Sequence, residues 1–130
     1  MPKFNVSLCP CESGLTYQQC CEPLHQGTLA SSAEALMRSR YTAYALELED
    51  YLLATWHPKT RPSSLNLKED SPIKWLGLQI KRTQELSNNS AIVEFIARYK
   101  IGGGRANRLH EISEFVHDDR WYYLQAVSPD

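Results

Sequence analysis

Apolar residues recur with a helical period in the first half of the chain. The positions concerned are Ala33, Leu36, Met37, Tyr41, Tyr44 and Leu48. Steps of three and four residues place side chains on one face of an α-helix, and Ser31 or Ser32 can cap its first turn. Asp50 is expected to cap a shorter helix that reaches Trp56, because Pro58 disfavours a helical conformation at the preceding residue. The pattern therefore predicts two consecutive helices.

The period changes from helical to alternating near residue 75. Leu76, Leu78 and Ile80 alternate with other residues, which predicts a strand with one buried face. Three further strands are expected over residues 91–100, 107–117 and 121–127, with turns at Asn88-Asn89, at Gly102-Gly103-Gly104 and at Asp118-Asp119. Helices followed by a run of strands predict an α+β domain whose helices pack on one face of an antiparallel sheet.

The stretch between the helices and the strands, residues 57–74, contains Pro58, Pro62 and Pro72 and shows no clear period. A long segment of this kind is typical of a lid or binding loop. It is equally compatible with plain packing, and the sequence favours neither interpretation.

Length and composition fit one domain with a small appendage. The chain has 130 residues, 42% of them hydrophobic and 10% aromatic, which is sufficient to fill a core. Its formal charge is -1, so no global field attracts nucleic acid or anionic lipid. Residues 1–8 lack the apolar run of a signal peptide, and no uncharged apolar run approaches the roughly 20 residues that span a bilayer. We therefore expect a cytoplasmic protein without a membrane segment.

The four cysteines are clustered as Cys9-x-Cys11, eight residues, and then Cys20-Cys21. In a reducing compartment such clusters bind metal or carry out redox chemistry more often than they form structural disulfides. Four thiolates on a short loop match a tetrahedral zinc site, and Zn²⁺ would supply much of the folding free energy of so small a region. A redox or sulfur-relay role, including a strained Cys20–Cys21 disulfide, is the alternative. His25 is the nearest other ligand, although a surface or supporting role is favoured for it.

A family resemblance extends from this cluster. The segment CPCESGLTYQQCC, residues 9–21, resembles the SEC-C motif, a short zinc-binding element known from a preprotein translocase ATPase. Its continuation over residues 22–27, 33–44 and 51–58, with WLGL at 75–78 and RWYY at 120–123, is similar to the YchJ-like family of bacterial proteins. The resemblance covers nearly the whole chain.

The resemblance implies a SEC-C zinc element over residues 1–27 and a domain like nuclear transport factor 2 (NTF2) over residues 28–130. In that fold, helices close one side of a strongly curved sheet and leave a cone-shaped cavity. The zinc ligands of the motif correspond to Cys9, Cys11, Cys20 and Cys21.

The chain departs from the motif at two places. The motif usually has glycine where Glu12 stands, and lysines are common where this chain has Leu15, Gln18 and Gln19. The basic surface that could meet acidic partners or ribosomal RNA is therefore missing. Four thiolates and one Zn²⁺ would together add two negative charges, which further disfavours nucleic acid as a partner.

Residues expected to line the cone come from the helices and the concave face of the sheet. They are Arg40, Tyr41, Tyr44, Trp56, His57, Trp75 and His110, with Glu111 as a further polar candidate. Aromatic walls with a few polar groups suit a small ligand, although aromatics at this spacing also fill cores. His110 and Glu111 are adjacent on a strand, so they should point to opposite faces and form a poor catalytic pair. Arg38 and Arg40 are expected to be solvated or paired with Glu47, Glu49 or Asp50.

Two classes of function follow. The first is a non-catalytic zinc protein. Its zinc element over residues 1–27, here called the knuckle, is an interaction element, and its cone binds a protein partner or small-molecule ligand. The alternative is an enzyme that uses His57 or His110 as acid–base and Arg40 as an anion anchor. The sequence has no nucleophile elbow, phosphate loop or metalloprotease signature. The fold does not choose between the classes, and a homodimer formed through the sheet is a fold-level expectation.

Overall fold

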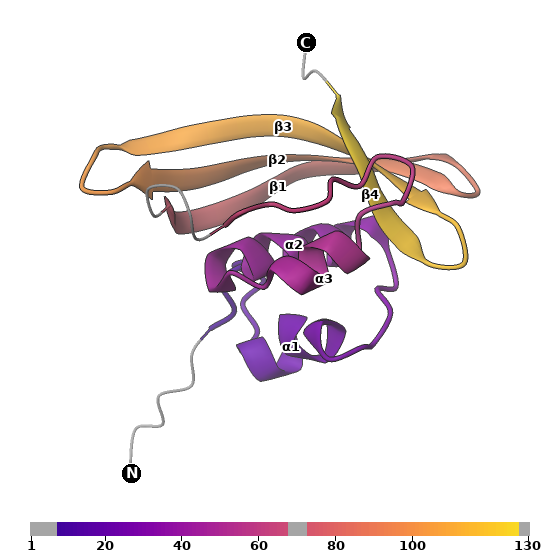
Figure 1. Ribbon diagram of the computed structural model, residues 1–130, viewed down its shortest axis with the longest axis horizontal. Coiled ribbons are helices and arrows are strands. Elements are labelled where there is room, and N and C mark those ends of the chain that lie inside the picture. Colours follow the sequence, from indigo (N-terminus) through magenta and orange to yellow (C-terminus); the bar gives the residue numbers. More distant parts are fainter. Residues whose placement is uncertain (1–7, 68–72, 128–130) are drawn as a thin grey trace.

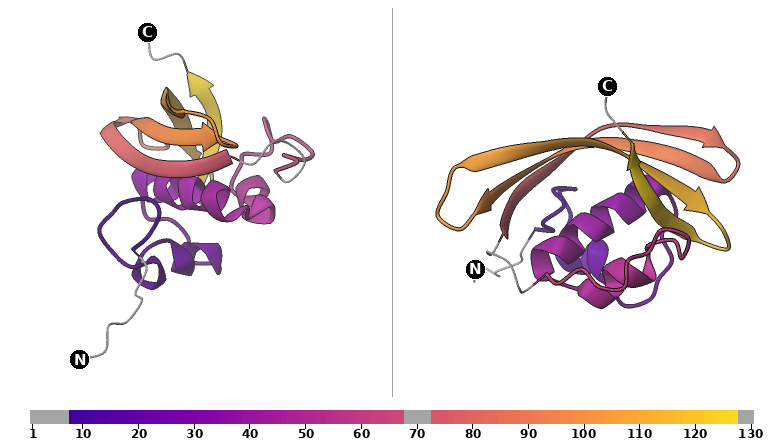
Figure 2. Two further views of the ribbon diagram at one scale, coloured as in Figure 1. Left: turned by 90° about the vertical axis from the view of Figure 1, so that its left-hand side faces the viewer. Right: turned by 45° about the horizontal axis from the view of Figure 1, so that its top comes forward.

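A four-stranded antiparallel sheet curves over a layer of helices (Figures 1 and 2). The computed structural model describes residues 8–67 and 73–127. A 3-10 turn at Tyr17–Gln19 precedes helices α1 (Cys21–His25), α2 (Ala33–Leu46) and α3 (Glu49–Ala54), and strands β1 (Ile73–Ser87), β2 (Ser90–Ile101), β3 (Ala106–His117) and β4 (Trp121–Val127) follow in that order across the sheet. The predicted α+β fold, with helices on one face of a curved antiparallel sheet, is confirmed.

Helix α2 lies between two other layers of the molecule. The sheet covers one side of it, and the segment that carries α1 lies on the other side (Figure 1). Ser32 caps the helix by accepting a hydrogen bond from the Ala35 amide at 3.0 Å. Because both sides are covered, α2 buries polar Ser39 and Thr42 completely as well as its apolar residues. The sequence pattern indicates a single apolar face, which accounts for the packing of α2 against one of these layers but not against both.

Strand β2 corresponds to the strand expected over residues 91–100 and lies at the centre of the core. Ala91, Val93, Phe95 and Ala97 are buried, and the residues between them point to the other face. In the register with β3, Ala91 lies opposite Phe115 and Val93 opposite Ser113. These pairs place the apolar face of the sheet against the helices.

Strand β1 is longer than the sequence predicts and contains irregularities. Its pairing with β2 shifts between Trp75 and Gly77 and again between Ile80 and Arg82. Each such shift inserts a residue, and bulges of this kind bend and twist a strand. As a result Trp75, rather than Leu76, shares the core-facing side with Leu78, so the predicted set of Leu76, Leu78 and Ile80 is wrong at its first member.

The segment after α3 attaches to strand β4. The amide of His57 donates to the carbonyl of Tyr123 at 2.8 Å, and the Tyr123 amide donates to Thr55 at 2.9 Å. The hydroxyl of Thr60 donates to the Leu124 carbonyl at 2.6 Å. The described part of the proline-containing stretch, residues 57–67, is thus packed along the domain, whereas residues 68–72 lie outside the described parts of the chain.

Of the helices in the two described ranges, none has the length and apolar character needed to cross a membrane.

Candidate metal centre and cone cavity

The four cysteine sulfurs come together beside α2. Their Sγ atoms all lie within 4.8 Å of one another, and Cys11 and Cys20 are 3.6 Å apart. All four are free thiols, of which Cys9, Cys11 and Cys21 are buried and Cys20 is half-buried. In a tetrahedral zinc site with Zn–S bonds of about 2.3 Å, the sulfurs lie roughly 3.8 Å apart. The donor set and spacing therefore fit one Zn²⁺.

Turns in the loop bring the two cysteine pairs together. The Cys9 amide donates to the Leu15 carbonyl at 2.8 Å, and the Glu12 amide donates to the Cys9 carbonyl at 3.0 Å. Thr16 then accepts a hydrogen bond from the Gln19 amide at 3.2 Å and so begins the 3-10 turn that leads to the second pair. The loop folds back on itself, as the wide separation of the pairs in sequence requires.

Glu12 occupies the position at which the SEC-C motif usually has glycine. Its φ is 63°, in the left-handed region that favours glycine. Its carboxylate lies over Gly77 of β1, so that a Cβ at this position would collide with Oε2 of Glu12 and approach Nη2 of Arg98 to 2.7 Å. Glu12 thus joins the knuckle to the sheet.

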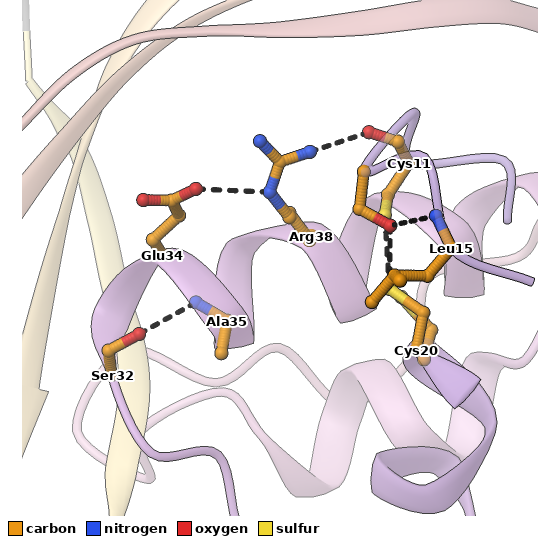
Figure 3. A network of polar contacts seen from close by, with 9 residues as sticks. Cys11, Leu15, Cys20, Ser32, Glu34, Ala35 and Arg38 are labelled. Atoms are coloured by element: carbon orange, nitrogen blue, oxygen red, sulfur yellow. Dashed lines mark hydrogen bonds and ion pairs between the residues drawn. The ribbon is translucent and has the colours of Figure 1, made fainter. Parts of the chain in front are cut away.

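Polar groups of α2 support the cysteine loop. Arg38 donates from Nη1 to the carbonyl of Cys11 at 2.8 Å and pairs through Nε with Glu34 at 3.1 Å (Figure 3). On the sulfur side, Ser13 lies 3.1 Å from Sγ of Cys20, and Thr42 lies 3.6 Å from Sγ of Cys9. Such outer contacts orient metal ligands and tune their basicity.

The protons of the cysteine cluster are distributed unevenly. Hydrogen bonding from Cys21 lowers the pKa of Cys11 to about 4. The same hydrogen bond, together with burial, raises the pKa of Cys21, and burial raises the pKa of Cys20 to about 11. Burial thus disfavours the ionisation of several of these thiols at once. A divalent metal ion with a preference for sulfur would stabilise the thiolate forms.

His25 is held by contacts that leave no ring nitrogen for a metal. Its Nε2 donates to the carbonyl of Ser39 at 2.8 Å, and its Nδ1 accepts from the hydroxyl of Tyr17 at 2.8 Å. Burial lowers the pKa of His25, which favours this neutral form. The ring also packs edge-on against Tyr51 with centroids 4.6 Å apart. His25 thus connects the knuckle to α2 and α3.

The knuckle shares its core with the rest of the domain. Cys9, Cys11 and Cys21 belong to the same cluster of buried residues as Leu36 and Phe115. A metal bound to these sulfurs would therefore stabilise the packing of α2 as well as the cysteine loop.

A cavity of about 310 Å³ lies between α2 and the sheet. Five of the eight residues expected there line it: Arg40, Tyr41, Tyr44, Trp75 and Glu111. The remaining lining residues are Met37, Phe95, Ala97, Leu109, Ser113 and Tyr123. Most of this wall is apolar, and its charged groups are Arg40 and Glu111.

The other three expected residues lie elsewhere. Trp56 packs edge-on against Tyr123 with centroids 4.9 Å apart, because the chain after α3 runs along β4. His57 lies beside that strand, with Nε2 3.3 Å from Asp118. His110 points to the opposite face of the sheet, where its Nε2 lies 2.6 Å from Glu94. The sequence prediction is corrected at these three positions.

The pairing of β3 with β2 explains why His110 and Glu111 separate. His110 lies opposite Ile96, whereas Glu111 lies opposite the buried Phe95 and so lines the cavity. The prediction that these neighbours point to opposite faces is confirmed. It makes Glu111, which the sequence indicated only weakly, the carboxylate of the cavity.

Arg40 is buried within the helical layer. It is 4% exposed, and its Nη1 donates to the Leu52 carbonyl at 2.8 Å and to the Thr55 hydroxyl at 2.7 Å. Its guanidinium carbon lies 4.6 Å from the ring centroid of Tyr123. The expectation that both arginines are solvated or paired with Glu47, Glu49 or Asp50 is wrong for Arg40, which is turned inward. Arg38 pairs with Glu34 and keeps 22% of its side chain exposed.

Together, the fold and the cysteine cluster define an NTF2-like domain that carries a SEC-C knuckle. Residues 32–126 match the family model of the YchJ middle NTF2-like domain, and residues 7–23 match that of the SEC-C motif. A UPF0225 protein of Xanthomonas oryzae pv. oryzae is 51% identical over 119 residues, which cover 91% of this chain and 92% of the relative. One from Chromobacterium violaceum is 52% identical over 124 residues, covering 92% and 91%. The chain belongs to this YchJ-like UPF0225 family.

Two solved structures have the same arrangement. A SEC-C motif containing protein from Rhodopseudomonas palustris, determined in solution, superimposes with a TM-score of 0.84 at 39% identity and covers 94% of this chain and 98% of its own. The crystal structure of a SEC-C motif containing protein from Psychrobacter arcticus gives a TM-score of 0.77 at 31% identity, covering 98% and 87%. The resemblance stated from the sequence is confirmed.

Proposed function

We propose that the protein binds one Zn²⁺ through Cys9, Cys11, Cys20 and Cys21. The observation that carries this proposal is the convergence of four free thiols within 4.8 Å of one another. Zinc accepts thiolate ligands in tetrahedral geometry and needs no redox change to hold a fold together. We place this protein in the cytoplasm, where a reducing environment keeps the thiols available to metal.

The bound metal makes the knuckle a preformed interaction element on the NTF2-like domain. Leu8 and Leu15, which are 66% and 49% exposed, lie on the surface of the cysteine loop and offer apolar contact to a protein partner. The cone of the same domain serves as a ligand-binding module, because its cavity combines apolar walls with few charged groups. We do not propose an acid–base enzyme, since His57 and His110 lie outside this cavity.

Metal analysis of protein purified without added zinc tests the metal site. We expect about one equivalent of zinc per chain and thiols that react only after denaturation or chelation. A Cys20→Ser variant should lose most of this zinc, whereas Ser63→Ala in the exposed loop after α3 should retain it. Less than about half an equivalent in the parent protein, with freely titratable thiols, would overturn the proposal.

A further inference from the structure

We propose that the cone cavity binds a small molecule with a flat apolar body, a carboxylate that contacts Arg40 and an ammonium group that contacts Glu111. Aromatic amino acids and close relatives of them belong to this chemical class. The assignment rests on the ligand-binding role proposed for the cone and is independent of the metal site.

Arg40 supplies a buried positive charge without a matching negative one. Its partners, the Leu52 carbonyl and the hydroxyls of Thr55 and Tyr44, are neutral. Within residues 8–67 and 73–127, no carboxylate forms an ion pair with it. A buried charge without an opposite charge is costly, and the rings of Trp56 and Tyr123 offer the guanidinium only their neutral faces. Because Arg40 lines the cavity, a carboxylate entering there would complete its pairing.

Glu111 provides a second charge on the wall of the same cavity. Its Oε2 accepts a hydrogen bond from Ser113 at 3.0 Å, which leaves the carboxylate with further capacity to accept. Glu111 and Arg40 are not paired with each other in the described residues. Because Arg40 and Glu111 line one cavity without pairing, they suit a zwitterionic ligand whose carboxylate contacts Arg40 and whose ammonium group contacts Glu111.

Two tyrosines lie within the influence of both charges. Burial raises the pKa of Tyr123 to about 12, with Glu111 raising it further and Arg40 opposing this rise. Burial likewise raises the pKa of Tyr44, where Arg40 lowers it and Glu111 raises it. The phenols stay neutral and can donate or accept hydrogen bonds between the two charged groups.

The rest of the cavity fits an apolar body. Met37, Phe95 and Ala97 contribute apolar lining, and Trp75 packs edge-on against Tyr41 with centroids 5.7 Å apart. Aromatic walls favour a flat ring through edge and offset stacking. At about 310 Å³ the cavity lies at the small end of ligand sites, which commonly measure about 300–1,000 Å³.

Titration with four related probes, in which two-dimensional amide NMR detects binding, tests the assignment. The probes are L-tyrosine, 3-(4-hydroxyphenyl)propionate without the amine, tyramine without the carboxylate, and p-cresol without either. We expect tyrosine to bind with the highest affinity and p-cresol with the lowest, with shifts at cavity residues. Failure of every probe to bind at about 1 mM, or binding of p-cresol as tight as that of tyrosine, would overturn the assignment.

Variants separate the two charged contacts. Arg40→Met should weaken tyrosine and the propionate at least about tenfold and tyramine little, and Glu111→Gln should weaken tyrosine and tyramine but not the propionate. Arg108→Met, at an exposed site outside the cavity, is the matched control. Ala97→Leu, which fills the cavity, should abolish binding of all probes even if Arg40→Met fails to fold. Unchanged tyrosine affinity in Ala97→Leu, or in a folded Arg40→Met, would contradict the assignment.

Zinc content is measured for each variant, so that the two proposals fail separately. One equivalent of zinc together with no probe binding would reject the ligand class and leave the metal site standing. Probe binding with the expected pattern in a protein without zinc would reject the metal site alone.

Discussion

Arg38 of α2 donates a hydrogen bond of 2.8 Å to the carbonyl oxygen of Cys11, a residue that precedes it by 27 positions. The contact fixes the cysteine loop to the central helix of the domain (Figure 3). The same helix contributes Arg40 to the cone cavity on its other side. The candidate metal centre and the cavity are therefore built on one element.

Replacing Arg38 by methionine should destabilise the protein by about 1.5–3 kcal/mol, because a charged donor to a partly buried carbonyl is lost. Zinc affinity should fall with it, since the Cys11 loop loses its support. Urea unfolding and zinc competition with a chromophoric chelator measure the two effects. Glu34→Gln is the matched control, because it removes the ion pair between Arg38 and residue 34 and keeps the hydrogen bond from Arg38 to the Cys11 carbonyl. It should cost no more than about 0.5 kcal/mol, and an equal cost for both variants would show that the Cys11 contact is unimportant.

Glu12 and Gly77 should be energetically coupled. Gly77→Ala places a methyl group against the Glu12 carboxylate and should destabilise the parent protein. In a Glu12→Gly background the carboxylate is absent, so the same substitution should cost at least about 0.5 kcal/mol less. Glu12→Gly alone should stay within about 1 kcal/mol of the parent, since relief of the left-handed φ is offset by the flexibility of glycine. Additive free energies of unfolding in this double-mutant cycle would exclude the contact.

His25 should make the protein sensitive to mild acid. Because burial lowers its pKa in the folded state, the unfolded chain binds a proton at higher pH than the folded chain does. This contribution is fully present above the unfolded pKa of about 6.5 and declines as the pH falls below it. Urea unfolding measures the free energy of unfolding at pH 7.5 and at pH 5.5. Its decrease between these pH values should be larger for the parent protein than for His25→Gln. His117→Gln, at an exposed histidine, is the control. Equal pH dependence of the parent and His25→Gln would contradict the buried neutral histidine.

Removal of the metal should loosen α2 as well as the knuckle. Cys9, Cys11 and Cys21 share a core with Leu36, so loss of the cation removes the bonds that hold these sulfurs together within that core. After chelation, hydrogen exchange should accelerate in residues 9–25 and along α2, with little change at the β2–β3 pairing. Re-addition of zinc should restore protection. Exchange that changes only within the cysteine loop would show that the knuckle is a separate unit.

The sequence was sufficient for those features that depend on local patterning. The helical period between Ala33 and Tyr44 predicted α2, and the strand expected over residues 91–100 corresponds to β2. The clustering of the four cysteines, together with their match to the SEC-C motif, predicted the sulfur cluster. Each of these signals involves residues close together in the chain.

Features that depend on distant contacts could not be predicted. The register shift that exchanges Leu76 for Trp75 arises from pairing with β2, and the attachment of Trp56 to Tyr123 depends on β4, which follows much later in the chain. Arginine is a residue type usually found at the surface, and Arg40 is buried because α3 and β4 pack against it. His25 was the nearest alternative metal ligand in the sequence, and its hydrogen bond to the distant Ser39 carbonyl could not be predicted from local residues.

Zinc K-edge X-ray absorption spectroscopy of the protein as purified reports the ligands of the bound metal. We expect a single shell of four sulfur atoms at about 2.3 Å from the metal, contributed by Cys9, Cys11, Cys20 and Cys21. A shell that contains nitrogen or oxygen ligands, or fewer than four sulfurs, would contradict this expectation.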